Sequence, residues 1–210
     1  MVANANPMRH NDVRSHMMSS LDLDPATTAL VLIDLQRGIT STSTAPHPAS
    51  EVIERARALA ARFRARRALV VLVRVDPGPN GELFPNAPVD APRPPRSGPM
   101  PADWTEIVPA LGPEPGDIVV TKHQPGAFFG TDLDVQLRRR GVRTIVIGGI
   151  STNVGVEATA RVAYESGYAL VFVEDAMAAR EADLHTHAVT RFFPTIGRVR
   201  STADVLAALE

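Results

Sequence analysis

The stretch from Thr144 to Ala163, TIVIGGISTNVGVEATARVA, most limits what this chain can fold into. It begins with an apolar run that suits a buried strand, passes through Gly148-Gly149 into a polar turn, and ends in a helical pattern. A strand, a tight turn and a helix N-terminus place backbone N–H groups and the positive end of a helix dipole at one point. In an open α/β sheet, ligands bind at such a point. The stretch therefore predicts both a fold class and the position of a site.

Short apolar runs alternate with helical patterns along the chain. Buried parallel strands are continuously apolar because helices cover both faces of the sheet. The runs lie at residues 29–33, 69–75, 117–121, 145–147, 169–173 and 196–199. The pairs Thr131 with Asp134 and Ser201 with Asp204 resemble capping boxes at helix starts, and a helix is expected over residues 181–193. This alternation predicts a three-layer α/β/α sandwich with a six-stranded, mostly parallel sheet.

Composition excludes several classes of function. The 210 residues suit one domain, and a formal net charge of -1 gives no basis for binding nucleic acid or an anionic membrane surface. The Cys count of 0 rules out disulfides, thiolate catalysis and cysteine-based metal sites. No apolar run has the length of a membrane span, and the N-terminus lacks the apolar core of a signal peptide. We expect a cytoplasmic protein with a flexible arm over residues 1–22 and one domain over residues 23–210.

One long segment lacks any periodic pattern. Residues 76–101 contain nine of the 18 prolines. A structureless segment of this length inside a compact domain is usually a lid, a binding loop or an oligomer contact. We expect it to help cover the site or a subunit interface rather than to be an inert insertion. Trp104, which follows it, is expected to be a packing anchor.

Two charged residues and one turn fall where predicted strands end. Asp34 follows the first strand, Lys122 the third, and the turn from Ile150 to Gly155 the fourth. Because the carboxyl ends of parallel strands meet at one sheet edge, we expect the three to converge there. The Asp and the Lys are either a structural ion pair or a proton-transfer pair beside an anionic substrate. Burial would raise the pKa of Asp34 and Lys122 would lower it, and the sequence leaves that balance open.

Three motifs resemble the isochorismatase-like (cysteine hydrolase) superfamily. They are TALVLIDLQ at 28–36, TKHQPGAFFGTDL at 121–133 and GGISTNVGVEATARVA at 148–163, and the resemblance covers residues 24–209. It implies a parallel sheet in the strand order 3-2-1-4-5-6. It also implies a homo-dimer or homo-tetramer, with the proline-rich segment and the helix after Asp175 as candidate contacts.

The resemblance further implies an Asp–Lys–Cys triad for most members. Asp34 matches the Asp and Lys122 matches the Lys, but the family Cys falls on Gly155. Hydrolysis of an amide or nitrile through a thioester is therefore excluded by that route. The isochorismatase branch also has Gly at this position. In that branch the Asp is a general acid toward a vinyl ether, and water attacks the resulting cation to give pyruvate and a dihydroxy-dihydrobenzoate.

The turn before the helix carries further implied features. The family has a cis peptide that corresponds to Ile150–Ser151, and the N–H groups of Ser151 and Gly155 would form an oxyanion hole. Ser151-Thr152-Asn153 resembles the cysteine-hydrolase version of the turn, where the isochorismatase branch has Tyr-Ala-His, and Gln124 stands where that branch has Arg. We assign contacts with a small-molecule substrate to Gln36, Gln124, Phe128, Ile150, Ser151 and Asn153.

Metal binding is not expected from the sequence. Nicotinamidase-like members of the superfamily bind zinc through Asp-x-His after the second strand, whereas this chain has Asp-Pro-Gly-Pro at 76–79. The histidines show no clear ligand spacing, and we expect them at the surface. They are His10, His16, His47, His123, His185 and His187. We predict no metal and no other cofactor.

Three functions remain open at this stage. The favoured one is a hydrolase without a Cys nucleophile, in which Asp34 is the acid and base, Lys122 its electrostatic partner, and the turn an anion hole. Retention of a charge pair whose burial is costly favours catalysis. The second is a non-catalytic small-molecule-binding pseudoenzyme, which loss of the nucleophile favours. The third is a structural oligomer, for which the proline-rich segment gives modest support.

Overall fold

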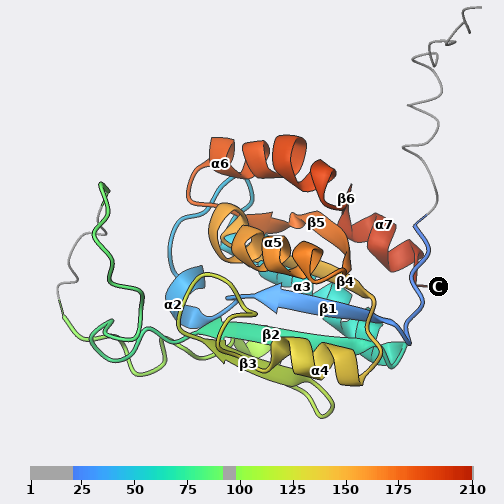
Figure 1. Cartoon of the computed structure of the whole chain (residues 1–210), viewed down its shortest axis with the longest axis horizontal. Helices are drawn as coiled ribbons and strands as arrows, with labels where there is room; N and C mark the ends of the chain where they lie inside the picture. The colour runs from blue at the N-terminus through green and yellow to red at the C-terminus, as the bar shows by residue number, and fades with distance from the viewer. Residues whose placement is uncertain (1–20, 92–97, 210) are drawn as a thin grey trace, which may run out of the picture.

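A parallel six-stranded sheet forms the centre of the structure. The computed structural model describes residues 21–91 and 98–209, and its strands run in the order β3-β2-β1-β4-β5-β6 (Figure 1). The strands are β1 (Thr28–Ile33), β2 (Leu69–Val75), β3 (Ile118–Lys122), β4 (Thr144–Ile150), β5 (Ala169–Ala178) and β6 (Arg198–Arg200), and each pairs with its neighbours in parallel. The predicted fold class and strand order are confirmed. The predicted arm over residues 1–22 lies outside the described residues except for Leu21 and Asp22.

Helices cover both faces of this sheet and complete the predicted sandwich. On one face lie α3 (Ala49–Ala65) and α7 (Thr202–Ala207). On the other lie α4 (Leu133–Arg139), α5 (Glu157–Glu165) and the π- and 3-10-helical turns η3 (Ala188–Phe192) and η4 (Phe193–Thr195). The remaining elements are α2 (Arg37–Thr40), η1 (Pro109–Leu111), the π-helical turn η2 (Thr152–Val156) and α6 (Ala182–His187). No helix among the described residues is long and apolar enough to cross a bilayer.

The central strand β1 shows why the apolar runs had to be strands. All of its residues are buried, and their side chains alternate between the two faces. Leu30 and Leu32 pack with α3 in one core, whereas Val31 and Ile33 pack with α5 in the other. A strand with helices on both faces has no solvated side, so its sequence cannot alternate with polar residues.

One helix start and one helix interior differ from expectation. The Ser201–Asp204 capping box is present at α7, but the expected box at α4 is wrong: α4 begins at Leu133, with no side-chain cap. The Asp134 carboxylate instead accepts a hydrogen bond from the Tyr168 hydroxyl at 2.8 Å, a tertiary contact that outweighs the local one. The helix expected over residues 181–193 is divided into α6, η3 and η4. This division lets the Phe193 ring stack on Phe172, with ring centroids 4.0 Å apart.

Strand β5 is longer than the apolar run that predicted it. The run ended at Val173, but the strand continues to Ala178 after a register shift against β4. Gly149 pairs with Met177 in the shifted register, and the added residues Ala176 to Ala178 are fully buried. The polar pair Glu174-Asp175 therefore lies within a strand and not at its end.

Gly149 provides a test of the central β1–β4 pairing. It has φ 124°, and a Cβ added to it would lie 2.1 Å from the Ile33 carbonyl oxygen, which is rigid backbone. We expect Gly149→Ala to lower the free energy of unfolding by more than about 3 kcal/mol, because the β1–β4 pairing must open. Urea unfolding followed by circular dichroism measures this.

Gly141→Ala is the matched control for Gly149→Ala. Gly141 also has a positive φ, 69°, but a Cβ there meets nothing within 4 Å. Only the conformational cost of a left-handed residue applies, roughly 1–2 kcal/mol. Equal losses of stability in the two variants would contradict the close approach at Gly149.

Candidate active site

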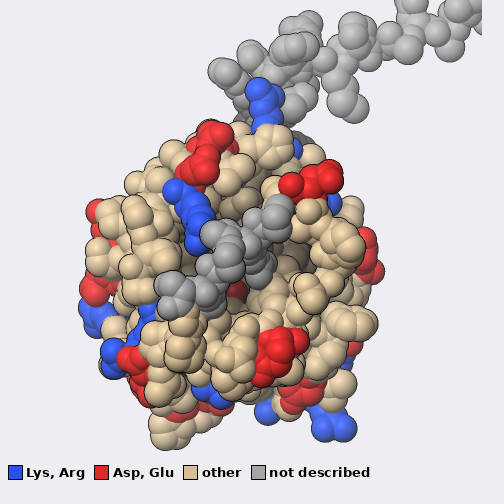
Figure 2. All heavy atoms as spheres, turned by 90° about the vertical axis from the view of Figure 1, so that its left-hand side faces the viewer, with Lys and Arg blue, Asp and Glu red and all other residues tan. Residues whose placement is uncertain are grey.

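A large pocket opens at the carboxyl ends of the strands. This edge lies at the left of Figure 1 and faces the reader in Figure 2, where most of the described surface is uncharged and the charged side chains lie mainly toward the rim. The pocket has a volume of about 1300 Å³, and Asp34, Ile150, Ser151, Asn153 and Gly155 are among the residues that line it. It sits between the ends of the neighbouring strands β1 and β4. From β1 the sheet continues to β2 and β3 on one side, and from β4 it continues to β5 and β6 on the other. Ligands usually bind at this reversal of strand order.

Asp34 and Lys122 form a buried ion pair beside this pocket. Lys122 Nζ lies 3.0 Å from Asp34 Oδ2, and the two side chains are 0% and 9% exposed, respectively. Strand β2 separates the strands that carry them, so their backbones are about 10 Å apart and only a long side chain can close the gap. The Lys122 ammonium also donates a hydrogen bond to the Pro125 carbonyl, which fixes its position. The predicted convergence of the two charges is thus present.

The Asp34 carboxyl is poised to hold a proton. Burial raises its pKa to about 6, and the opposing attraction of Lys122 is the smaller effect. Oδ2 faces Lys122, whereas Oδ1 is buried and accepts no hydrogen bond from any residue within 21–91 or 98–209. A buried, unpartnered oxygen favours the protonated form, because a neutral hydroxyl costs less to bury than half of a carboxylate charge. The carboxyl can therefore act as acid and as base near neutral pH.

Gly155 lies directly over the ion pair. A Cβ added to Gly155 would lie 2.9 Å from Asp34 Oδ2 and 3.2 Å from Lys122 Nζ. Any side chain at this position would therefore touch both charged groups, and glycine leaves that space to the pocket. The third residue of the predicted catalytic set is thus adjacent to the other two.

The turn from Ile150 to Gly155 forms one wall of the pocket. The Ile150–Ser151 peptide bond is cis, as the family resemblance implied. Residues 152–156 form a π-helical turn that leads directly into α5. Buried Thr152 anchors this turn through a 2.9 Å hydrogen bond between its hydroxyl and His185 Nδ1. Ser151 and Gly155 both line the pocket, so the two residues of the expected oxyanion hole border the same space.

The predicted substrate-contact residues divide into two groups. Gln124, Ile150, Ser151 and Asn153 all line the pocket. The Gln124 side-chain amide donates to the carbonyls of Gly126 and Phe129, which leaves its oxygen as the group free to meet a ligand.

The other two predicted contacts, Gln36 and Phe128, need correction. Gln36 is fully buried, and its amide bonds to the N–H and carbonyl of Val75 and to the carbonyl of Trp104. Phe128 packs in the core against Tyr168, with ring centroids 6.1 Å apart. Neither lines the pocket among the described residues, and both are structural.

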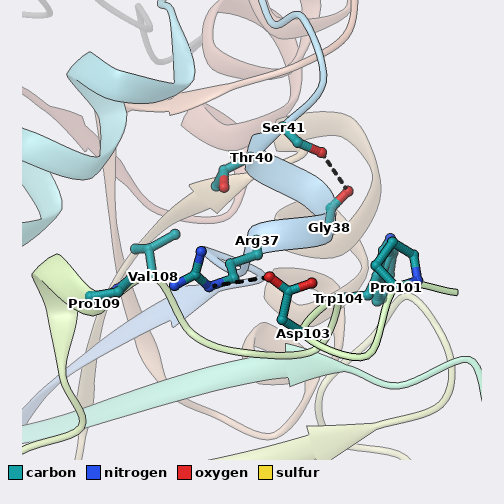
Figure 3. A pocket seen from close by; sticks show the side chains of 9 residues that line it. All are labelled: Arg37, Gly38, Thr40, Ser41, Pro101, Asp103, Trp104, Val108 and Pro109. Carbon is teal, nitrogen blue, oxygen red and sulfur yellow. Dashed lines mark hydrogen bonds and ion pairs between the residues drawn. The ribbon is translucent and has the colours of Figure 1, made fainter.

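The proline-rich segment borders the pocket, as expected. Its described parts contribute lining residues from Pro77 to Asn86 and from Gly98 to Pro101. Trp104 lines this pocket and a smaller neighbouring one of about 440 Å³. Arg37 and Asp103, joined by a 3.7 Å ion pair, also line the smaller pocket (Figure 3). Trp104 packs tightly: a Cβ on Gly38 would lie 2.1 Å from its ring nitrogen. Trp104 therefore packs against Gly38 and also borders both pockets.

Comparison with known proteins agrees with this geometry. The Isochorismatase domain matches residues 28–204. The chain belongs to the isochorismatase family. It is 49% identical to the uncharacterized isochorismatase family protein YecD of Escherichia coli O157:H7, over 90% of this chain and all of YecD. An isochorismatase family protein from Burkholderia thailandensis has a similar structure, with a TM-score of 0.85 and 47% identity over 91% of this chain and 99% of that one.

More distant members of the isochorismatase family include enzymes with named activities. N-carbamoylsarcosine amidase from Thermoplasma acidophilum is 28% identical and superimposes with a TM-score of 0.66, over 84% of this chain and 96% of that one. Members of the family are hydrolases, and this chain is an isochorismatase-family hydrolase.

Sequence reasoning missed residues that approach the isochorismatase-family site from the segment after β5. Arg180 and Leu184 line the pocket, and His185 holds the turn through Thr152. His185 is 3% exposed, so the expectation of a surface histidine is wrong there. Burial lowers the pKa of its imidazole to about 4, so the ring is neutral. Nothing in the local sequence marked these residues, because only the fold brings the segment over the β4 turn.

Replacing Asp34 by Asn tests the state of the buried carboxyl. Asn suits the site because Asp34 has φ 54°, a left-handed conformation that both residues tolerate. The folded pKa of about 6 exceeds the ordinary 3.8, so the folded state binds the proton more tightly, and stability falls as pH rises through this range. Relative to Asp34→Asn, we expect the wild-type free energy of unfolding to fall by roughly 1 kcal/mol between about pH 5 and about pH 7.5.

Urea unfolding of both proteins at these two pH values measures the change. The Asn variant is the reference, because it lacks the titrating group and keeps the shape of the side chain. The Asp34 pKa is not raised if the difference in the free energy of unfolding between the two proteins is the same at both pH values. The same conclusion holds if this difference favours the wild type more at the higher pH.

Proposed function

We propose that this hydrolase acts without a covalent intermediate on a small carbonyl- or carboxylate-bearing molecule, with Asp34 as general acid and base. The observation that supports it is the buried Asp34 carboxyl, which has a pKa near 6 and an uncommitted Oδ1, beside a glycine that leaves the reaction space open. The Cys count of 0 excludes a thioester route, and in this proposal water is the attacking group.

Hydrolysis of a vinyl ether is the reaction that suits this arrangement best. The proton on Asp34 adds to the terminal carbon of the double bond, and the ether carbon becomes an oxocarbenium ion. Water adds to that carbon and returns a proton to the Asp34 carboxylate. The resulting hemiketal then collapses to a ketone and an alcohol, so one water is consumed and the carboxyl is regenerated. This cycle needs a carboxyl that exchanges its proton near neutral pH.

Lys122 and the turn have supporting roles in this proposal. The Lys122 ammonium, 3.0 Å from Asp34 Oδ2, stabilises the carboxylate formed after proton transfer. The N–H groups of Ser151 and Gly155 would bind a substrate carboxylate, and Asn153 and Gln124 supply further polar contacts from the pocket wall. Gly155 has no side chain and therefore leaves the space beside the Asp34–Lys122 pair open for the substrate.

Release of pyruvate from isochorismate tests the proposal. We expect turnover by the wild type, with kcat/KM falling about tenfold per pH unit above pH about 6, because only protonated Asp34 delivers the proton. Asp34→Asn should lose at least about a hundredfold in kcat, within the usual contribution of a general acid. Asp132→Asn, which changes an exposed carboxylate near α4, is the control and should keep full activity.

The same experiment separates catalysis from binding alone. Pyruvate release that is unchanged in Asp34→Asn would overturn the role of Asp34. Absence of turnover, together with a change in Trp104 fluorescence on adding small carboxylates, would favour the non-catalytic binding protein. Trp104 suits this measurement because it is the single Trp of the chain and lines the pocket.

Gly155→Cys tests whether this position is that of a nucleophile. The chain has 0 Cys, so the introduced thiol is unique, and after a small shift of the ion pair its Cβ lies beside Lys122 Nζ. We expect the ammonium to lower the thiol pKa, so that iodoacetamide alkylates it at least about tenfold faster at neutral pH than a free cysteine. Adding Lys122→Met should remove the effect. An ordinary alkylation rate in the single variant would place Gly155 outside the reactive geometry.

A further inference from the structure

Three potential metal ligands, none of them part of the Asp34–Lys122 pair, meet beside β5. One ligand atom each from His47, Glu174 and His185 lies within 4.8 Å of the other two. They come from three distant parts of the chain: the loop after α2, strand β5 and helix α6. No local spacing in the sequence could have indicated this cluster.

The ligand atoms of this cluster are largely uncommitted. Among the described residues, the one basic side chain within 4.0 Å of the Glu174 carboxylate is that of His47, with 4.0 Å between His47 Nε2 and Glu174 Oε2. Within residues 21–91 and 98–209, the His47 ring and the Glu174 carboxylate have no hydrogen-bonding partner. Because no Arg or Lys among the described residues lies within 4.0 Å of the Glu174 carboxylate, its charge is available for a cation.

His185 is oriented as metal-bound histidines usually are. Its Nδ1 is hydrogen-bonded to the Thr152 hydroxyl at 2.9 Å, which leaves Nε2 as the uncommitted nitrogen. In metal sites, a hydrogen bond to the second ring nitrogen fixes the tautomer and aims the ring. The His47 and His185 rings meet edge to face, with centroids 5.8 Å apart, and so do not stack in a way that would hide their edges.

The backbone holds the cluster together while leaving it accessible. Ala45 and Ala179 exchange both backbone hydrogen bonds, at 2.8 and 2.9 Å, which ties the loop that carries His47 to the end of β5. The Thr44 hydroxyl donates to the His47 carbonyl at 2.8 Å. The side chains of His47 and Glu174 are 23% and 40% exposed, so an ion can enter from solvent.

We propose that His47, Glu174 and His185 bind a divalent transition-metal ion, with Zn²⁺ as the best match to two imidazoles and one carboxylate. Ligand atoms 4.8 Å apart lie roughly 2.8 Å from a common centre, against about 2.0–2.2 Å in zinc sites, so each must move inward by roughly 0.6–0.8 Å. The side chains of His47 and Glu174 are partly exposed, so rotation about their side-chain bonds can bring the ligand atoms closer. The site is separate from Asp34, and the inference does not depend on the proposed reaction.

The ion would act on the protein through Thr152. His185 fixes the Thr152 hydroxyl, and Thr152 belongs to the buried turn that forms the pocket wall. A bound ion would join the three segments in addition to the Ala45–Ala179 backbone hydrogen bonds and the Thr152–His185 hydrogen bond. Its expected role is therefore to stabilise the turn and the segment after β5.

Zinc binding by the full chain, made without an affinity tag and stripped with a chelator, tests this site. His10→Gln and His16→Gln are included in every protein, because those histidines lie outside the described residues and could bind zinc themselves. Equilibrium dialysis with metal analysis should give one Zn²⁺ per chain and a higher melting temperature. Glu174→Gln and His47→Gln should each weaken binding at least about tenfold. His187→Gln, an exposed histidine on the same helix as His185, is the matched control and should change nothing.

Cobalt provides a second measurement that needs no variant. Co²⁺ bound by imidazoles and a carboxylate in a four-coordinate site gives strong visible absorption, whereas octahedral Co²⁺ on a surface gives only weak bands. Strong absorption that Zn²⁺ removes stoichiometrically is expected. Absence of zinc uptake by the chelator-treated chain would overturn the proposal. So would uptake that is unchanged when His47→Gln and Glu174→Gln are combined in a protein with native circular dichroism.

Discussion

The site depends on a charge pair that is expensive to bury. Removing an ammonium and a carboxylate from water costs several kcal/mol for each ion, and mutual attraction returns that only with good geometry. Here the geometry is incomplete on one side: Lys122 reaches both Asp34 Oδ2 and the Pro125 carbonyl, while Asp34 Oδ1 has no partner among the described residues. Burial outweighs the attraction of Lys122 and raises the pKa of Asp34 to about 6. The rest of the fold must supply the stability that this arrangement costs.

The sheet supplies this stability through two continuous apolar cores, one on each face. Strand β1 carries Asp34 at its end and is buried along its whole length, with Val31 and Ile33 on one face and Leu30 and Leu32 on the other. A carboxylate attached to such a strand has no freedom to turn toward solvent. The rigidity of the strand therefore keeps Asp34 at the pocket, and the length of the Lys122 side chain lets β3 reach across β2 to meet it.

The sequence predicted the parts of this protein that depend on local pattern. Continuous apolar runs marked the strands, and Asp34, Lys122 and the turn at Ile150 were placed correctly because parallel strands end at one edge. The prediction failed where a contact between residues far apart in the sequence determines the position of a side chain. Gln36 follows a strand, as a site residue would, but its side chain is hydrogen-bonded to backbone groups of Val75 and Trp104. His185 belongs to a helix with a polar sequence, but its ring is buried against Thr152. Such partners are far apart in sequence, and only the fold brings them together.

The Gln36 contacts have a consequence for how this protein can vary. One amide joins Val75, where the chain leaves β2, to Trp104, where the long proline-rich excursion returns. Both ends of the proline-rich segment are thus fixed to Gln36, so the distance between the two ends does not depend on the number of residues between them. Closing a loop between fixed ends costs only slightly more free energy as residues are added. The proline-rich segment can therefore be replaced by another sequence without moving its two ends. Related proteins with the same fold can thus differ in the substrates they accept, while the Asp34–Lys122 pair keeps its position.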